Sequence, residues 1–237
     1  MKKIFLLSFW AFTLLRINAQ PCVSPNPNLV LNPGFETGTP PGANGPNGSL
    51  LTNNVANWAS LFGNPNQIQT SDYWNNIFGM TQNRCAAMYV GYGGTALTIN
   101  TREGLQGKLS QPIQSNSGIY CFSFQLAKHP FSFNVGTIRM VVYGIKINGN
   151  FTVFNNSPLG ALNMNMLYPG IQKIPLALFD VSNVGATPVF MQRTFNSNII
   201  PNGSSIDAII ITRSDEISRG QNDIRYMLVD EVVLRKL

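Results

Sequence analysis

Histidine, charge and long apolar runs are scarce in this 237-residue chain, and each shortage excludes a class of function. The one histidine is His129, and no serine lies in the Gly-x-Ser-x-Gly pattern of a nucleophile elbow. Charged residues make up 11% of the chain, and no run of Lys or Arg occurs, so the footprint of nucleic-acid binding is missing. We expect a protein that is not an enzyme, binds no nucleic acid, and carries His129 as a solvated loop residue.

Cysteine is scarce too, with Cys22, Cys85 and Cys121 as the three examples. No two of them are close in sequence, which excludes a metal site of the Cys-x-x-Cys type. In an exported chain two could form a disulfide and leave the third over, but the sequence does not decide which two pair. Because Cys121 lies in an apolar strand, we expect it to be structural and not nucleophilic.

The longest apolar run stands at the N-terminus. Two lysines precede the apolar stretch Ile4–Leu15, and Ala19 offers a small residue for cleavage. The stretch is too short to span a bilayer, and an arginine follows it. We expect residues 1–19 to be a signal peptide and residues 20–237 to be one exported domain without membrane insertion, located in the periplasm, on the cell surface or outside the cell.

Short β-branched and aromatic segments between turn residues are abundant. Residues Ile119–Leu126 alternate, and we expect Tyr120, Phe122 and Phe124 to lie in the core. An Asn-Gly pair at positions 148–149 predicts a hairpin, and residues Leu176–Val181 could form a short helix. Further strands are expected at Arg84–Val90, Thr137–Ile147, Phe151–Phe154, Val189–Phe195, Ile206–Thr212 and Arg225–Leu234. About nine or ten such strands predict an all-β, antiparallel β-sandwich.

The two ends of the chain carry the most distinctive segments. Residues Asn28–Glu36 run from three apolar residues into an Asn-Pro-Gly turn and predict an opening strand. Trp58 follows a loop rich in Gly and Pro and is expected in the core. In the closing segment Tyr226–Leu234, alternation places Asp230 on the same face as its apolar neighbours. We expect the two end segments to open and close one sandwich.

These segments, together with Gly118–Phe124, resemble the galactose-binding-like jelly-roll domains, among them the CenC-type carbohydrate-binding modules. They are also similar to exported domains of Gram-negative bacteria in which an Arg-Glu pair, here Arg102-Glu103, precedes the central strand. The resemblance implies a jelly-roll fold and a non-catalytic, lectin-like carbohydrate-binding function. The competing class is a structural or adhesive surface protein that contacts other proteins or itself.

The resemblance also implies a structural calcium site, in which Glu36 and Asp230 would bind the ion together with backbone carbonyls. Carboxylate and carbonyl oxygens are the ligands that calcium prefers. The alternative is that Asp230 meets an arginine or backbone N–H groups.

Two loops carry the residue types that bind sugars. Tyr73 and Trp74 lie in a polar loop, and Tyr92 and Arg102 bracket a loop rich in Gly and Thr. Aromatic rings stack on the C–H faces of sugars, and polar groups fix the hydroxyls, so we expect these four residues to contact a glycan. The alternative is that the aromatic residues cover a sheet edge or fill a small core of their own.

Overall fold

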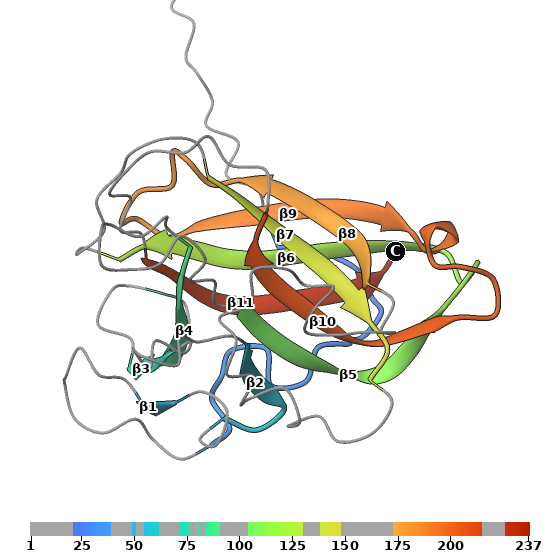
Figure 1. Cartoon of the computed structure of the whole chain (residues 1–237), viewed down its shortest axis with the longest axis horizontal. Helices are drawn as coiled ribbons and strands as arrows, with labels where there is room; N and C mark the ends of the chain where they lie inside the picture. The colour runs from blue at the N-terminus through green and yellow to red at the C-terminus, as the bar shows by residue number, and fades with distance from the viewer. Residues whose placement is uncertain are drawn as a thin grey trace, which may run out of the picture.

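The fold is that of a computed structural model, in which two antiparallel sheets lie one over the other (Figure 1). It describes residues 21–38, 49–50, 55–61, 72–75, 80, 84–90, 104–129, 138–147, 173–214 and 226–237. Within these ranges, no helix has the length and apolarity that a membrane crossing requires.

One sheet has six strands and the other has five. The six-stranded sheet contains, in spatial order, β1 (Ser49–Leu50), β3 (Asp72–Asn75), β4 (Arg84–Tyr89), β11 (Tyr226–Lys236), β6 (Ile119–Lys128) and β9 (Val189–Asn196). The five-stranded sheet contains β2 (Trp58–Leu61), β5 (Gly104–Gln114), β10 (Ser205–Arg213), β7 (Arg139–Ile145) and β8 (Lys173–Asp180). A short 3-10 helix, η2 (Ser197–Ile199), connects β9 to β10. The predicted antiparallel sandwich is confirmed.

The inner faces of the two sheets form the main core. The predicted core residues of β6 are buried there, and the ring of Phe124 meets that of Phe179 from β8 edge-on, with 5.0 Å between the ring centroids. Trp58 is 1% exposed, as predicted, and its indole N–H donates to the Asn32 carbonyl oxygen at 2.8 Å. Alternate residues of each strand therefore point inward, which leaves the others on the two outer faces.

The opening segment 28–36 bridges the two sheets and does not form a regular strand. The Leu29 N–H donates to the Leu234 carbonyl of β11, whereas the Leu29 carbonyl accepts from the Ser110 N–H of β5. Because the segment divides its hydrogen bonds between two sheets, its only ladder contact is the isolated bridge between Val30 and Leu109. The prediction of a regular strand at residues 28–36 is therefore wrong. The expectation that this segment lies beside the closing segment 226–234 is confirmed.

A disulfide joins Cys22 to Cys121 of β6 and leaves Cys85 free and buried. The structural role predicted for Cys121 is confirmed. The pairing places the start of the described chain on the outer face of the six-stranded sheet, where the Cys22 N–H donates to the Ser123 hydroxyl at 3.1 Å.

Two local predictions were wrong. His129 is 3% exposed and not solvated. Its backbone N–H donates to the Tyr226 carbonyl, and its ring packs edge-on against the Tyr226 ring. Residues 176–180 belong to strand β8 and not to a helix; a register irregularity there puts both Leu176 and Ala177 in the core and interrupts the alternation. The predicted hairpin at positions 148–149 lies outside the described residues.

Candidate functional site

The outer face of the five-stranded sheet presents one continuous row of residues across all its strands. Gln106 of β5 pairs with Ile210 of β10, which pairs in turn with Tyr143 of β7. The row ends at Ala59 of β2 and Pro175 of β8. Trp58 and Ile209, the neighbours of two of these residues along the chain, lie in the inter-sheet core, so the row itself faces outward.

Exposure along this row increases toward β8. Gln106 and Ile210 are fully buried, although they face away from the inter-sheet core. Tyr143 is half-buried and Pro175 is exposed. Leu178 of β8 faces outward as well and is 41% exposed. The accessible part of the face therefore lies over β7 and β8 and combines one phenol ring with apolar neighbours.

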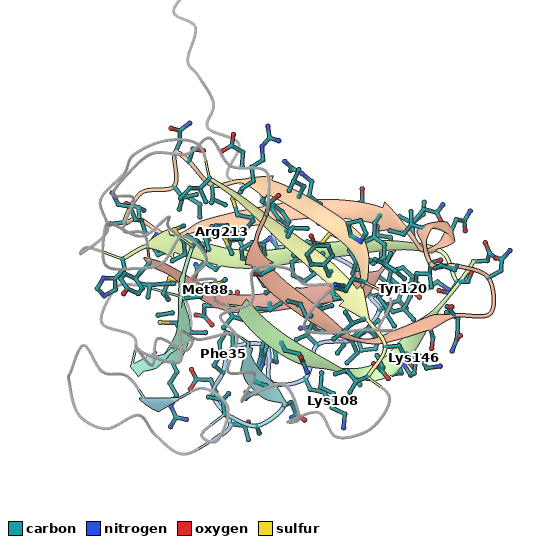
Figure 2. All side chains as sticks on the ribbon, in the orientation of Figure 1. Phe35, Met88, Lys108, Tyr120, Lys146 and Arg213 are labelled. Carbon is teal, nitrogen blue, oxygen red and sulfur yellow. A yellow bond between two sulfur atoms is a disulfide. The ribbon has the colours of Figure 1, made fainter. Side chains whose placement is uncertain are left out.

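A second outward row, next to the first, ends in a lysine on each side. Lys108 of β5 pairs with Ala208 of β10, which pairs with Ile145 of β7, and Ile145 pairs with Lys173 of β8. Lys108 is exposed and Lys173 is half-buried. Lys146 follows Ile145 at the end of β7 and is also exposed; Lys108 and Lys146 lie toward the same end of the sandwich (Figure 2).

The opposite end of this face carries the Arg139–Asp180 pair across β7 and β8. The Ser182 hydroxyl donates to the Asp180 carboxylate at 2.6 Å, and the Ser182 N–H donates at 3.0 Å. These two bonds, with a smaller contribution from Arg139, hold the pKa of Asp180 below its usual value. This carboxylate is therefore already engaged within the fold.

Of the four predicted ligand-binding residues, the structure places the backbone of two. Tyr73 and Trp74 belong to β3 of the six-stranded sheet, where they pair with Ala86 and Cys85, and their side chains lie outside the described part of the structure. Tyr92 and Arg102 fall wholly outside the described residues. The contribution of all four to glycan binding stays a prediction.

Glu36 ends the opening segment and Asp230 lies on β11, and the Val232 N–H of β11 donates to the Pro33 carbonyl of that segment at 3.0 Å. Burial raises the pKa of the Cys85 thiol, and the negative charges of Asp230 and Glu36 raise it further, so both carboxylates lie close to this thiol. Asp230 is fully buried and accepts from the Glu231 N–H at 2.7 Å. A Glu36 carboxylate oxygen accepts from the Arg84 N–H at 2.7 Å.

The seam between the opening segment and β11 offers oxygen ligands to a hard cation. The backbone carbonyls of residues 36 and 38 point toward the Arg84 guanidinium, and carboxylate and carbonyl oxygens are the donors that suit calcium. The Arg84 guanidinium donates to the Glu36 carbonyl at 2.8 Å. Among the described residues, no three His, Cys, Asp or Glu side chains form a metal-binding group, so an ion would depend on these carbonyls. The residues fit calcium, and they also provide the arginine and N–H partners of the alternative.

Sequence reasoning did not single out Tyr143 or Gln106. The available signal was the alternation of Arg139, Val141, Tyr143 and Ile145, which places an aromatic residue on one face of that strand. Which strands pair on either side of it, and hence the row from Gln106 to Tyr143, depends on contacts that are distant in sequence.

No protein-family model and no curated protein matches this chain. Solved structures do resemble it. A family 61 carbohydrate-binding module in complex with beta-1,4-galactotriose is 11% identical, with 89% of this chain and 99% of that chain covered and a TM-score of 0.42. A family 28 module specific for non-crystalline cellulose is 11% identical, with 90% and 98% covered and a TM-score of 0.45.

An adhesin domain of Lys-gingipain from Porphyromonas gingivalis is 14% identical, with 86% of this chain and 96% of that chain covered and a TM-score of 0.43. The chain is an all-β, two-sheet antiparallel sandwich that resembles the jelly rolls of carbohydrate-binding modules.

Proposed function

We propose that the chain is an exported, non-catalytic domain that binds a polysaccharide on the outer face of its five-stranded sheet. The observation that carries the proposal is the half-buried Tyr143 ring, set in an outward row between Ile210 and the exposed Pro175. A phenol ring bordered by apolar side chains offers a stacking surface to the C–H face of a sugar, and its hydroxyl can bond to sugar hydroxyls. The buried disulfide supports the proposed export, because such bonds persist in oxidising compartments.

Removal of the ring tests the proposal. In titrations with a panel of plant and bacterial polysaccharides, Tyr143→Ala should weaken binding of the best ligand by about tenfold or more, since truncation of a central aromatic contact typically costs over 1 kcal/mol. The matched control is Tyr226→Ala, which removes a half-buried tyrosine from the other sheet. Equal affinity of wild type and Tyr143→Ala, or binding lost equally in both variants, would contradict the assignment of this face.

An adhesive function is the second candidate, favoured by a separate surface. Three large apolar side chains at one end of the six-stranded sheet are 45–53% exposed: Ile119, Ile199 and Leu237. The Leu237 N–H donates to the Ile119 carbonyl, which places these two side by side. Ile199 belongs to η2, which directly follows β9, the strand that pairs with Ile119. Exposed apolar patches often mark contacts between proteins. Sedimentation velocity over a hundredfold range of protein concentration tests self-association through this patch. Dimers of the wild type that are lost in Ile119→Lys would favour it, and a wild type that stays monomeric at every concentration would exclude it.

At the seam between the chain ends we propose a structural calcium ion held by Glu36 and Asp230. The full burial of Asp230 supports this, because a buried carboxylate is costly unless hydrogen bonds or a cation compensate its charge, and the charges of Asp230 and Glu36 both act on the Cys85 thiol. The ion would fasten the opening segment to β11 and would take no part in catalysis.

Calcium removal tests this proposal directly. Calcium should raise the Tm above its value in EDTA, because an ion that binds only the folded chain stabilises it. Glu36→Gln and Asp230→Asn should abolish the difference, whereas the control Asp180→Asn, on the other sheet, should retain it. The same Tm in calcium and in EDTA would show that Arg84 and the backbone N–H groups alone satisfy these carboxylates.

A further inference from the structure

Strand β9 stands at an open edge of the six-stranded sheet. All of β9 pairs with β6 without a register shift, and no other described strand forms a ladder with it. The side chains from Val189 to Thr194 are half-buried or exposed. The side of β9 that faces away from β6 therefore offers backbone N–H and C=O groups that no described strand pairs with.

The edge strand of the other sheet is built differently. β8 also stands last in its sheet, but it contains Pro175, and its ladder with β7 has a register irregularity beside that residue. Prolines, irregular ladders and lysines are devices by which natural edge strands avoid pairing with other chains. β9 has none of these three over its eight residues. Its edge is thus the better suited of the two to accept another strand.

The one charged side chain of β9 is Arg193. A charge that points inward can guard an edge strand. Here, however, the guanidinium lies over the Phe179 ring of β8, with 5.4 Å between the guanidinium carbon and the ring centroid, and it donates to the Gln192 carbonyl at 2.8 Å. The cation is therefore satisfied within its own chain, and a facing strand does not have to compensate it.

The sequence of β9 selects one register for pairing with a second copy of the same strand. Two identical antiparallel strands pair about a two-fold axis, at which one residue faces its own copy. An axis at Arg193 would set two cations directly opposite each other, which is destabilising. An axis at Met191 would keep only positions 189–193 in the ladder. An axis at Gln192 keeps positions 189–195 and sets Arg193 opposite Met191.

At this register the other facing side chains match in kind. Val189 faces Phe195 on the inner side, where both pack against the main core. Phe190 faces Thr194 on the outer side. Because aromatic and β-branched residues directly opposite each other stabilise a sheet, the two-fold repeats each favourable pair.

We propose that two copies of this chain join through their β9 strands, antiparallel and with Gln192 facing its own copy, so that their six-stranded sheets become one continuous sheet. The two-fold axis is perpendicular to that sheet, so both five-stranded sheets lie on the same side of the dimer. Such a dimer would offer two polysaccharide-binding faces to one polymer, which strengthens binding through multivalency. The pairing itself does not depend on the proposed function, because it uses other residues on the other sheet.

A charge swap at position 192 tests this register. Sedimentation velocity of the wild-type domain over a wide range of protein concentration should show a reversible dimer. Gln192→Lys and Gln192→Glu should each raise the dissociation constant of the dimer about fivefold or more, because like charges then face each other at the axis. An equimolar mixture of the two variants should return to within about twofold of the wild-type constant, since each lysine then faces a glutamate.

Position 194 provides the matched control. Thr194 is exposed on the same face of β9, but at the proposed register it faces Phe190 and not its own copy. A mixture of Thr194→Lys and Thr194→Glu should therefore dimerise no more tightly than either variant alone. Circular dichroism melts verify that the variants are folded.

The possible failures are distinguishable. A wild type that stays monomeric at every concentration would overturn the proposal. Dimers that persist in both Gln192 variants and are lost in Ile119→Lys would assign the contact to the apolar patch at the end of the sheet, and would overturn it as well. Dimers that each charge weakens but the mixture does not restore would contradict the two-fold register at Gln192.

Discussion

At the scale of single residues, Asn28 joins the start of the chain to its end. Its amide oxygen accepts from the N–H groups of Val30 and Leu234 at 3.1 and 2.9 Å, and its amide nitrogen donates to the Val232 carbonyl at 3.0 Å. The ladder between β11 and β6 shifts register between Asp230 and Val233, so Asn28 satisfies the backbone next to a bulge.

Truncation of this side chain should therefore be costly. Asn28→Ala leaves a β11 N–H and a β11 carbonyl without their partner, and an unsatisfied buried polar group costs about 1–3 kcal/mol. We expect the free energy of unfolding to fall by about 2–3 kcal/mol in urea denaturation. In the control Asn26→Ala the lost bond is exposed, and the Ser24 hydroxyl also donates to the same Lys236 carbonyl, so the loss should stay below about 1 kcal/mol. Equal losses would contradict the role given to Asn28.

The residues at this seam were partly predictable. The turn after Asn32 and the acidic positions Glu36 and Asp230 are visible as local patterns. Away from the seam, the burial of His129 was not predictable, because its backbone N–H and its ring both contact Tyr226, almost one hundred positions away in the chain. Lys-His-Pro-Phe gives no local sign of that partner.

At the scale of elements, β2 and β5 approach closely because β5 has a glycine opposite a tryptophan. Gly107 pairs with Trp58, and a Cβ atom at position 107 would lie 2.7 Å from the indole ring. The ring cannot easily yield, since its N–H bonds to Asn32 and its face meets Phe35 with 4.6 Å between centroids.

Gly107→Ala should therefore destabilise the fold by about 1–3 kcal/mol, the usual cost of overpacking a core. The control is Gly185→Ala, because no atom lies within 4 Å of a Cβ there. Thermal unfolding of both variants measures the difference. A Gly107→Ala variant as stable as wild type would mean that the indole has room to shift.

Strand positions were easier to predict than strand partners. Apolar segments between turn residues predicted β6, β10 and β11, whereas part of β8, in which the adjacent residues Leu176 and Ala177 are both buried, was expected to form a short helix. The candidate site was missed for the same reason. Tyr143 becomes part of a surface only when β10 and β8 lie on either side of it, and no local pattern specifies that order.

At the scale of the whole molecule, one covalent bond and hydrogen bonds to β11 hold the first described residues of the chain against the six-stranded sheet. The Cys22–Cys121 disulfide spans a sequence separation of 99 residues, and the Arg235 guanidinium donates to the Ser24 carbonyl at 3.0 Å. A cross-link over such a long loop removes much of the conformational entropy of the unfolded chain.

Reduction should lower the stability of the whole domain. We expect a loss of up to about 4–5 kcal/mol on treatment with a thiol reductant, measured as a drop in Tm, and the same drop in Cys22→Ser/Cys121→Ser without reductant. The control Cys85→Ala keeps the disulfide and should respond to reductant as wild type does. A Tm that reductant leaves unchanged would contradict the stabilising role of the bond.

The central claim is that a polysaccharide binds the outer face of the five-stranded sheet. Backbone amide shifts in two-dimensional NMR, recorded during titration with the polysaccharide that binds best in the panel, test it most directly because they report every strand at once. The account predicts that the largest shifts fall on Tyr143, Leu178 and their neighbours in β7 and β8, the accessible part of this face, with the β6 and β11 amides nearly unchanged. Shifts confined to the six-stranded sheet, or to residues around Tyr73 and Trp74, would contradict it.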